Sequence, residues 1–162
     1  MSTNLKKKSI TLLHGQFDKA ALDLLAKRKV NDVFLLEGRP SLESSKKMSQ
    51  ELLRRKIKPT IIADNMAGFL FYQNMVKEIF GAYQIADKNG AVCQIGTLIL
   101  AVLGNKHKVP VSLFPAKAKT ELMGKPKDIM QFNGQKVAPK NIHGYVPLVE
   151  WVPKKYIQKI YE

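Results

Sequence analysis

Short apolar runs that alternate with helical segments constrain the fold of this chain more than any other feature of its sequence. Each run is five to eight residues long and is bounded by turn or capping residues, as buried strands are. Strands that are largely apolar and alternate with helices indicate a mostly parallel sheet covered on both faces, so we expect a doubly wound α/β domain. The five predicted strands are Ser9–His14, Asp32–Leu36, Pro59–Ala63, Glu78–Ile85 and Val109–Phe114.

The segments between these strands show the spacing and the start signals of helices. Asp18 is a suitable N-cap for a helix that ends at the basic stretch Lys27–Lys29. The other predictions are a helix opening at Pro40, helices over Met66–Asn74 and Cys93–Asn105, a hairpin around Asn133-Gly134 within Met130–Pro139, and a final helix over Trp151–Tyr161 that begins at Pro153.

The length of 162 residues fits one domain with one hydrophobic core, and 45% hydrophobic with 25% charged residues is ordinary for a soluble fold. We expect this domain to span residues 9–162, after a basic tail at residues 1–8. No apolar run approaches the roughly 20 residues that cross a bilayer. The apolar run near the start is too short for a signal peptide. The sequence therefore predicts a cytoplasmic protein with no membrane partner.

The charge balance is the unusual part of the composition, because 27 Lys and Arg against 13 Asp and Glu give a net charge of +14. Such a surface attracts polyanions and acidic proteins, and salt screens the attraction. The lysines are spread along the chain, so a general lysine bias explains the same charge. The motifs of RRM, zinc-finger and KH domains are absent. Nucleic acid and an acidic protein therefore both stay open as partners.

Residues able to hold a metal or a cofactor are sparse. The one cysteine, Cys93, excludes an internal disulfide. His14, His107 and His143 lie too far apart for the short spacings of a metal site. No dinucleotide fingerprint follows the first strand, and no Walker A motif is present. We therefore expect no metal and no cofactor. At the predicted helix start a Cys93 thiolate would be favoured, whereas a buried free cysteine would be inert.

In open parallel sheets ligands bind outside the carboxyl ends of the strands, so the residues after each predicted strand are the candidates for a site. Alternatives stay open for them. Asp64 and Asn65 are also suited to capping the next helix. Glu37 and Arg39 are also able to pair with each other. The helix start at residues 94–97 offers backbone N–H groups to an anion. The segments concerned are residues 14–16, 37–40, 64–68, 83–90 and 115–117.

The order and spacing of these loops resemble the C-terminal Rossmann-like domain of methylthioribose-1-phosphate isomerases. The same domain occurs in ribose-1,5-bisphosphate isomerase and in the regulatory subunits of translation initiation factor 2B. The resemblance implies a single Rossmann-like domain with helices on both faces and, because the family's domains associate in pairs, a homodimer. The matching stretches are Gly38-Arg39-Pro40, Lys58–Gly68, Gly81-Ala82, Asn89-Gly90, Ile95-Gly96-Thr97, Val137-Ala138-Pro139 and Tyr145–Pro153, the last against the family's Y-N-P-x-F-D-x-T-P.

The departures from this family concern its chemistry. The family's catalytic cysteine and aspartate fall on Gly15 and Tyr83, so neither catalytic residue is retained. Glycine has no side chain to react, and a phenol with a pKa of about 10 is a poor base at neutral pH. A family lysine falls on Gln94 and a family glutamine on Glu43, and both changes lower the positive charge near the expected phosphate. The family's N-terminal helical domain has no counterpart in the sequence.

We therefore expect no catalytic residue, and a binding or regulatory domain that takes a sugar phosphate or a nucleotide or acts as a dimer. The second hypothesis is an isomerase with relocated chemistry, or one completed by a separate N-terminal chain. The third is a basic RNA- or ribosome-associated protein. Arg39 is expected to contact an anion and Asp64 the hydroxyls of a ligand. The candidate ligand-binding residues are Gly15, Gln16, Arg39, Asp64, Asn65, Tyr83 and Gln94.

Overall fold

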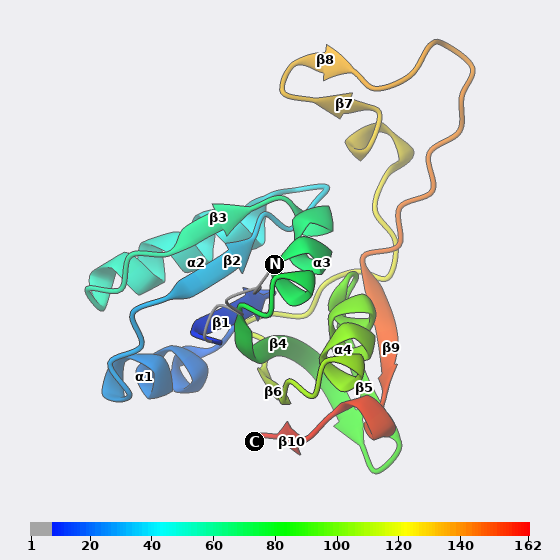
Figure 1. Cartoon of the computed structure of the whole chain (residues 1–162). Coiled ribbons are helices and arrows are strands. Elements are labelled where there is room, and N and C mark those ends of the chain that lie inside the picture. The colour runs from blue at the N-terminus through cyan, green and yellow to red at the C-terminus, as the bar shows by residue number, and fades with distance from the viewer. Residues whose placement is uncertain (1–7) are drawn as a thin grey trace, which may run out of the picture.

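A row of parallel strands with helices on both faces forms the centre of the computed structural model, which describes residues 8–162 (Figure 1). The predicted basic tail thus lies almost wholly outside the described residues. The row runs β3-β2-β1-β4-β6-β10, and each neighbouring pair is parallel. This order confirms the doubly wound, Rossmann-like α/β class. The strands are β1 (Ile10–His14), β2 (Val33–Leu36), β3 (Thr60–Ile62), β4 (Val76–Asp87), β6 (Val111–Pro115) and β10 (Lys159–Ile160).

Two helices cover each face of this row. Leu13 of β1 belongs to the buried cluster under α1 (Lys19–Lys27) and α2 (Glu43–Arg54). Its neighbour Leu12 belongs to the cluster under α3 (Ala67–Tyr72) and α4 (Thr97–Lys106), because successive strand side chains point to opposite faces. The predicted cap of α1 is confirmed, since the Asp18 carboxylate accepts a hydrogen bond from the Ala20 N–H at 3.0 Å. No helix among the described residues is long and apolar enough to cross a membrane.

The start of α2 differs slightly from the prediction. The helix begins at Glu43 rather than at Pro40, because residues 39–41 form a turn and Leu42 has a left-handed backbone (φ 60°). A short 3-10 helix, η1 (Asp64–Met66), precedes α3 and joins it to β3. The turn before α2 and the η1 segment both follow strands at the carboxyl edge of the sheet.

The antiparallel part of the sheet was not expected. The far half of β4 pairs with β5 (Gly90–Gln94), and β5 pairs with β9 (Val149–Pro153). The predicted helix from Cys93 is wrong at its start, because Cys93 lies in β5 and α4 begins at Thr97. The predicted C-terminal helix is also wrong. That segment forms β9, the short η3 (Lys154–Tyr156) and β10, because pairing with β5 and β6 supplies hydrogen bonds that override local preference.

Residues 116–148, between β6 and β9, leave the sheet as a long projection that we call the arm (Figure 1). The predicted hairpin is confirmed there as β7 (Gln131–Phe132) and β8 (Gln135–Lys136), with positive φ at Asn133 and Gly134. The chain returns along itself at the base of the arm, where Gly124 N–H donates to the Val146 carbonyl at 2.8 Å. No residue from 116 to 145 is buried.

Candidate functional site

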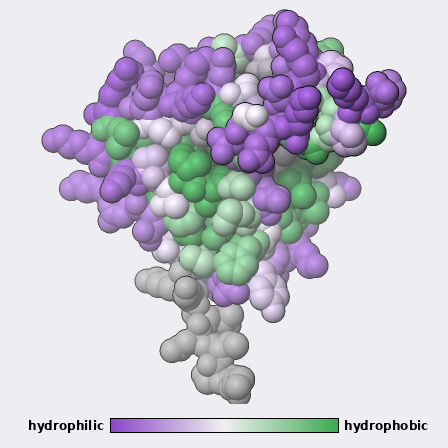
Figure 2. Space-filling view, turned by 90° about the horizontal axis from the view of Figure 1, so that it is seen from above, coloured by the Kyte–Doolittle hydropathy of each residue, from purple (hydrophilic) through white to green (hydrophobic). Residues whose placement is uncertain are grey.

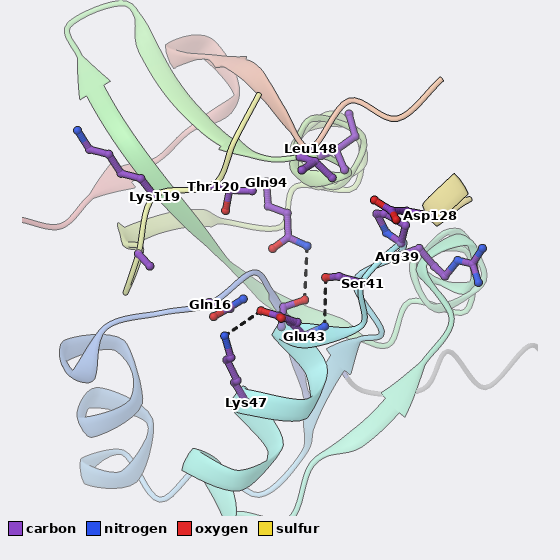
Figure 3. Close-up of a pocket in the computed structure, with 15 residues that line it drawn as sticks. Gln16, Arg39, Ser41, Glu43, Lys47, Gln94, Lys119, Thr120, Asp128 and Leu148 are labelled. Atoms are coloured by element: carbon purple, nitrogen blue, oxygen red, sulfur yellow. Dashed lines mark hydrogen bonds and ion pairs between the residues drawn. The ribbon is translucent and has the colours of Figure 1, made fainter. Parts of the chain in front are cut away.

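A cavity of about 270 Å³ opens at the carboxyl edge of the parallel strands (Figure 3). Gln16, which follows β1, forms part of its wall, as do the turn after β2 and the first turns of α2. The end of β5 and the start of the arm close the other side. Its lining residues include Gln16, Arg39, Ser41, Glu43, Ser44, Lys47, Gln94, Lys119, Thr120 and Asp128. The cavity thus lies where an open parallel sheet binds its ligands.

Amide and hydroxyl groups line the middle of this cavity. Gln94 Nε2 donates a hydrogen bond to Ser44 Oγ at 3.4 Å. Figure 3 shows Gln16, Glu43 and Lys47 close together on one side of the cavity, with Gln94 reaching toward them from β5. Lys47 Nζ lies 2.8 Å from the Glu43 carboxylate, and this pairing lowers the pKa of Glu43. The ion pair compensates its own charge, and the amides of Gln16 and Gln94 suit the hydroxyls of a ligand. Further charged groups in the lining are Arg39, Lys119 and Asp128.

Arg39 and Asp64 have contacts other than those expected of ligand-binding residues. The Asp64 carboxylate accepts hydrogen bonds from the Gly38 N–H at 2.9 Å and the Arg39 N–H at 2.8 Å, which fixes the turn after β2. The Arg39 guanidinium lies 4.2 Å from the ring centroid of Phe132 in the arm. Asp64 and Asn65 line a separate, more open hollow of about 500 Å³ that also contains Phe132. Arg39 borders both hollows.

Gly15 and Tyr83, at the two catalytic positions of the resembled family, do not line the cavity. Gly15 has φ +103°, and a Cβ added to it would lie 2.6 Å from the Ala82 Cβ, so a side chain does not fit there. The Tyr83 hydroxyl donates to the Tyr161 carbonyl at 2.7 Å, and burial raises the pKa of this phenol. Neither position supplies a group for proton transfer.

The expected anion site at the start of α4 is filled by a side chain of the protein itself. Glu150 of β9 accepts hydrogen bonds from the Gly96 N–H at 2.7 Å and the Leu98 N–H at 2.8 Å. The carboxylate satisfies N–H groups that a ligand anion would otherwise bind. Sequence reasoning missed Glu150, although it stands at the acidic position of the family's closing Y-N-P-x-F-D-x-T-P stretch.

Two buried side chains beneath the cavity, His14 and Cys93, are unreactive in their surroundings. His14 Nε2 lies 2.7 Å from the Ile95 carbonyl, so this nitrogen carries the proton, and burial lowers the pKa of His14. The other ring nitrogen, Nδ1, is buried without a hydrogen-bond partner. Burial raises the pKa of Cys93 to about 12, which corrects the idea of a favoured thiolate there. Within residues 8–162 no group of His, Cys, Asp and Glu side chains has the arrangement of a metal site.

The sheet order, with a cavity at the carboxyl edge of the parallel strands, defines a Rossmann-like domain. The particular family is shown by sequence, because residues 1–161 match the model of the initiation factor 2 subunit family, and the chain belongs to that family. A methylthioribose-1-phosphate isomerase of Desulfitobacterium hafniense is 34% identical over 147 residues, which are 83% of this chain and 42% of that protein. The chain therefore spans less than half the length of this relative.

Two solved structures have the same fold. The delta subunit of translation initiation factor eIF-2B from A. fulgidus superimposes with a TM-score of 0.82 at 18% identity, over 96% of this chain and 52% of that one. A 5-methylthioribose 1-phosphate isomerase from Pyrococcus horikoshii gives a TM-score of 0.76 at 23% identity, over 95% and 49%. These likenesses extend through nearly the whole chain.

Proposed function

We propose that this chain is a non-catalytic binding domain whose cavity takes the hydroxyl-bearing part of a sugar phosphate or a nucleotide. The composition of the cavity is the observation that most directly supports this proposal. The cavity is lined by Gln16, Gln94 and Ser44 at the ligand-binding edge of the sheet, while Gly15 and Tyr83 contribute no reactive group to it. A cavity lined by polar and apolar surface in about equal parts, with the amide groups of Gln16 and Gln94 among its lining, is suited to binding a small polar molecule.

The absence of a suitable base supports binding over turnover. Interconversion of an aldose and a ketose moves a proton between carbons or shifts a hydride, and it needs groups that polarise the oxygens. The Glu43 carboxylate, which lines the cavity, is paired with Lys47, and its lowered pKa makes it a weaker base. His14 is buried beneath the cavity and does not line it.

Calorimetric titration tests this proposal with methylthioribose 1-phosphate, ribose 5-phosphate and adenosine monophosphate. At least one compound is expected to bind, and Gln94→Leu is expected to weaken its affinity tenfold or more because a lining amide is lost. Gln50→Leu is the matched control, since Gln50 is exposed on α2 and does not line the cavity. Binding that Gln94→Leu leaves unchanged would place the ligand elsewhere, and no binding by any of the three would remove the proposal.

The second candidate is an isomerase completed by another polypeptide, and the relatives named as isomerases favour it. The matched region is 42% of the first of them, so the rest of that protein has no counterpart in the match. An assay of the purified chain with methylthioribose 1-phosphate tests the non-catalytic proposal. The chain alone is expected to give no ketose product, and turnover by the purified chain would overturn the non-catalytic proposal.

We further propose that two copies associate through the outer face of α3 and α4. These helices contact each other, and Phe71 of α3 packs against His107 beside α4, with the ring centroids 5.5 Å apart. Exposed apolar side chains gather on this side of the molecule, which is the lower half of the view in Figure 2. They are Met66, Phe69 and Tyr72 at α3, with Ile99 and Val102 on α4.

The sequence of this face explains why a second copy fits it. Residues 65–76 and 89–105 contain no charged residue in a chain of net charge +14. Two copies therefore approach through this face without bringing lysines together, and a helix that is apolar all round is typically covered on its outer side. Ultracentrifugation is expected to show a dimer that Ile99→Lys converts to a monomer. Leu53→Lys, at an exposed leucine of α2, is expected to stay dimeric.

A further inference from the structure

From the arm we infer an interaction surface that goes beyond the cavity and the α3–α4 face. We infer that the arm docks onto an acidic protein surface that also offers apolar contacts. The inference combines exposed apolar side chains, a local excess of lysine and a backbone held in place at its base. Each of these features is present within the described residues, and the ligand cavity does not account for them.

Large apolar side chains are exposed along the whole arm. A soluble surface tolerates single exposed apolar residues, but a dense series of them marks a site of contact with another molecule. Tyr145 has 78% of its surface exposed and Leu122 has 72%, which are values of side chains with almost no contacts. The exposed apolar residues of the arm are Leu122, Met123, Ile129, Phe132, Val137, Ile142 and Tyr145.

The charge of the arm indicates which kind of partner it would bind. It carries six lysines, whereas its acidic residues are Glu121 and Asp128. The Asp128 carboxylate is already engaged, since it accepts a hydrogen bond from the Lys125 N–H at 3.0 Å. A positive surface of this kind raises the association rate with a negatively charged partner. The lysines are Lys117, Lys119, Lys125, Lys127, Lys136 and Lys140.

The arm is attached firmly enough to present these side chains in a defined way. The Leu148 N–H donates to the Leu122 carbonyl at 3.0 Å, and the Thr120 N–H donates to Gln84 Oε1 at 3.0 Å. At the far end, Phe132 lies against the Arg39 guanidinium of the sheet. A surface that is already ordered loses less conformational entropy when it binds. The arm is therefore better suited to docking than a free loop of the same composition.

The side chains favour a protein over nucleic acid, and an acidic partner over a second copy. Single-stranded nucleic acid is bound on aromatic platforms, but five of the seven exposed apolar residues are aliphatic and the ring of Phe132 already faces Arg39. Aliphatic side chains need an apolar protein surface instead. Pairing of two arms is disfavoured, because the lysines of one arm would repel those of the other.

Fluorescence anisotropy tests this inference with a labelled, 20-residue amphipathic peptide of Glu, Asp and Leu. Its matched control replaces each acid by Lys. Two arm variants are used. The first combines Lys125→Gln, Lys127→Gln, Lys136→Gln and Lys140→Gln, and the second combines Val137→Ser and Ile142→Ser. The control protein combines Lys27→Gln, Lys46→Gln, Lys77→Gln and Lys88→Gln, at four lysines that are exposed outside the arm.

The acidic peptide is expected to bind, with an affinity that falls as salt rises. Each arm variant should weaken it at least tenfold, and the control variant less than twofold. Equal weakening by both lysine sets would overturn the inference, because general charge would then explain binding. Tighter binding of poly(U) RNA, self-association lost in the arm variants, or no binding of the acidic peptide would each overturn it as well.

Discussion

Residues 8–115 and 149–162, which we call the body, hold nearly all the buried side chains of the described chain, whereas no residue between 116 and 145 is buried. Glycine, acidic residues and histidine occur in both regions. The effect of substituting the same residue type can therefore be compared between the body and the arm. In the body these residues touch elements distant in sequence. In the arm they lie against other residues of the arm or are exposed to solvent. The same substitution should therefore cost much more in the body.

The largest difference is expected for glycine. Gly15→Ala should lower the free energy of unfolding by about 3 kcal/mol, because the new Cβ meets the Ala82 Cβ at 2.6 Å and φ is +103°. Gly134 in the arm is the matched control, since it also has a positive φ but nothing lies within 4 Å of an added Cβ. Gly134→Ala should cost about 1 kcal/mol or less. Urea unfolding measures both, and equal losses would break the comparison.

Removal of a carboxylate that caps a helical segment should also cost more stability in the body, at Glu150, than in the arm, at Asp128. Glu150→Ala leaves the N–H groups of Gly96 and Leu98 without their acceptor, and we expect a loss of about 2–3 kcal/mol. Asp128 caps the short 3-10 helix η2 (Pro126–Asp128) of the arm, which is exposed to water. Asp128→Ala should cost about 0.5 kcal/mol. A Glu150→Ala protein as stable as Asp128→Ala would show that α4 does not depend on this cap.

The histidines predict a dependence on pH. Because the pKa of His14 is lowered in the folded protein, the unfolded chain binds more protons just below pH 6.5. Stability should then fall as pH decreases below about 6.5, by at most about 1.4 kcal/mol per pH unit, and should not change from this cause above pH 7. Thermal unfolding between pH 5 and pH 7.5 measures this slope.

His14→Gln keeps a donor for the Ile95 carbonyl but cannot titrate, so this part of the slope should disappear in the variant. His143→Gln, at an exposed position of the arm, should leave the slope unchanged. A slope that survives in His14→Gln would have to come from another group.

The smallest effect is expected when the outer arm is removed. Replacing residues 125–144 by a short Gly-Ser turn removes the contact of Phe132 with Arg39, which is worth about 0.5–1 kcal/mol. The midpoint of thermal unfolding should fall by only about 2–4 °C. A larger fall, measured by calorimetry against the full chain, would show that the arm is part of the folding unit and would end the distinction between the two regions.

The site was predicted only in part. Three of the predicted residues line the cavity: Gln16 and Arg39, which follow β1 and β2, and Gln94, which was expected at a helix start but ends β5. The first turns of α2 and the start of the arm also line it, through Ser44, Lys47 and Thr120, and no local pattern indicates that these segments meet there. Asp64 and Tyr83 stand after or within the predicted strands, yet hydrogen bonds to Gly38, Arg39 and Tyr161 occupy them instead.

The sequence by itself determined the parallel strands, the cap at Asp18 and the hairpin at Asn133-Gly134, because apolar periodicity, capping and turn conformation act over a few residues. Its resemblance to the isomerases also predicts that Gly15 stands at the position of their catalytic cysteine. Tertiary structure alone decided that Cys93 and Glu150 face each other across two paired strands, and that Glu150 caps α4. Those outcomes depend on contacts between segments more than 50 residues apart, which no short-range preference encodes.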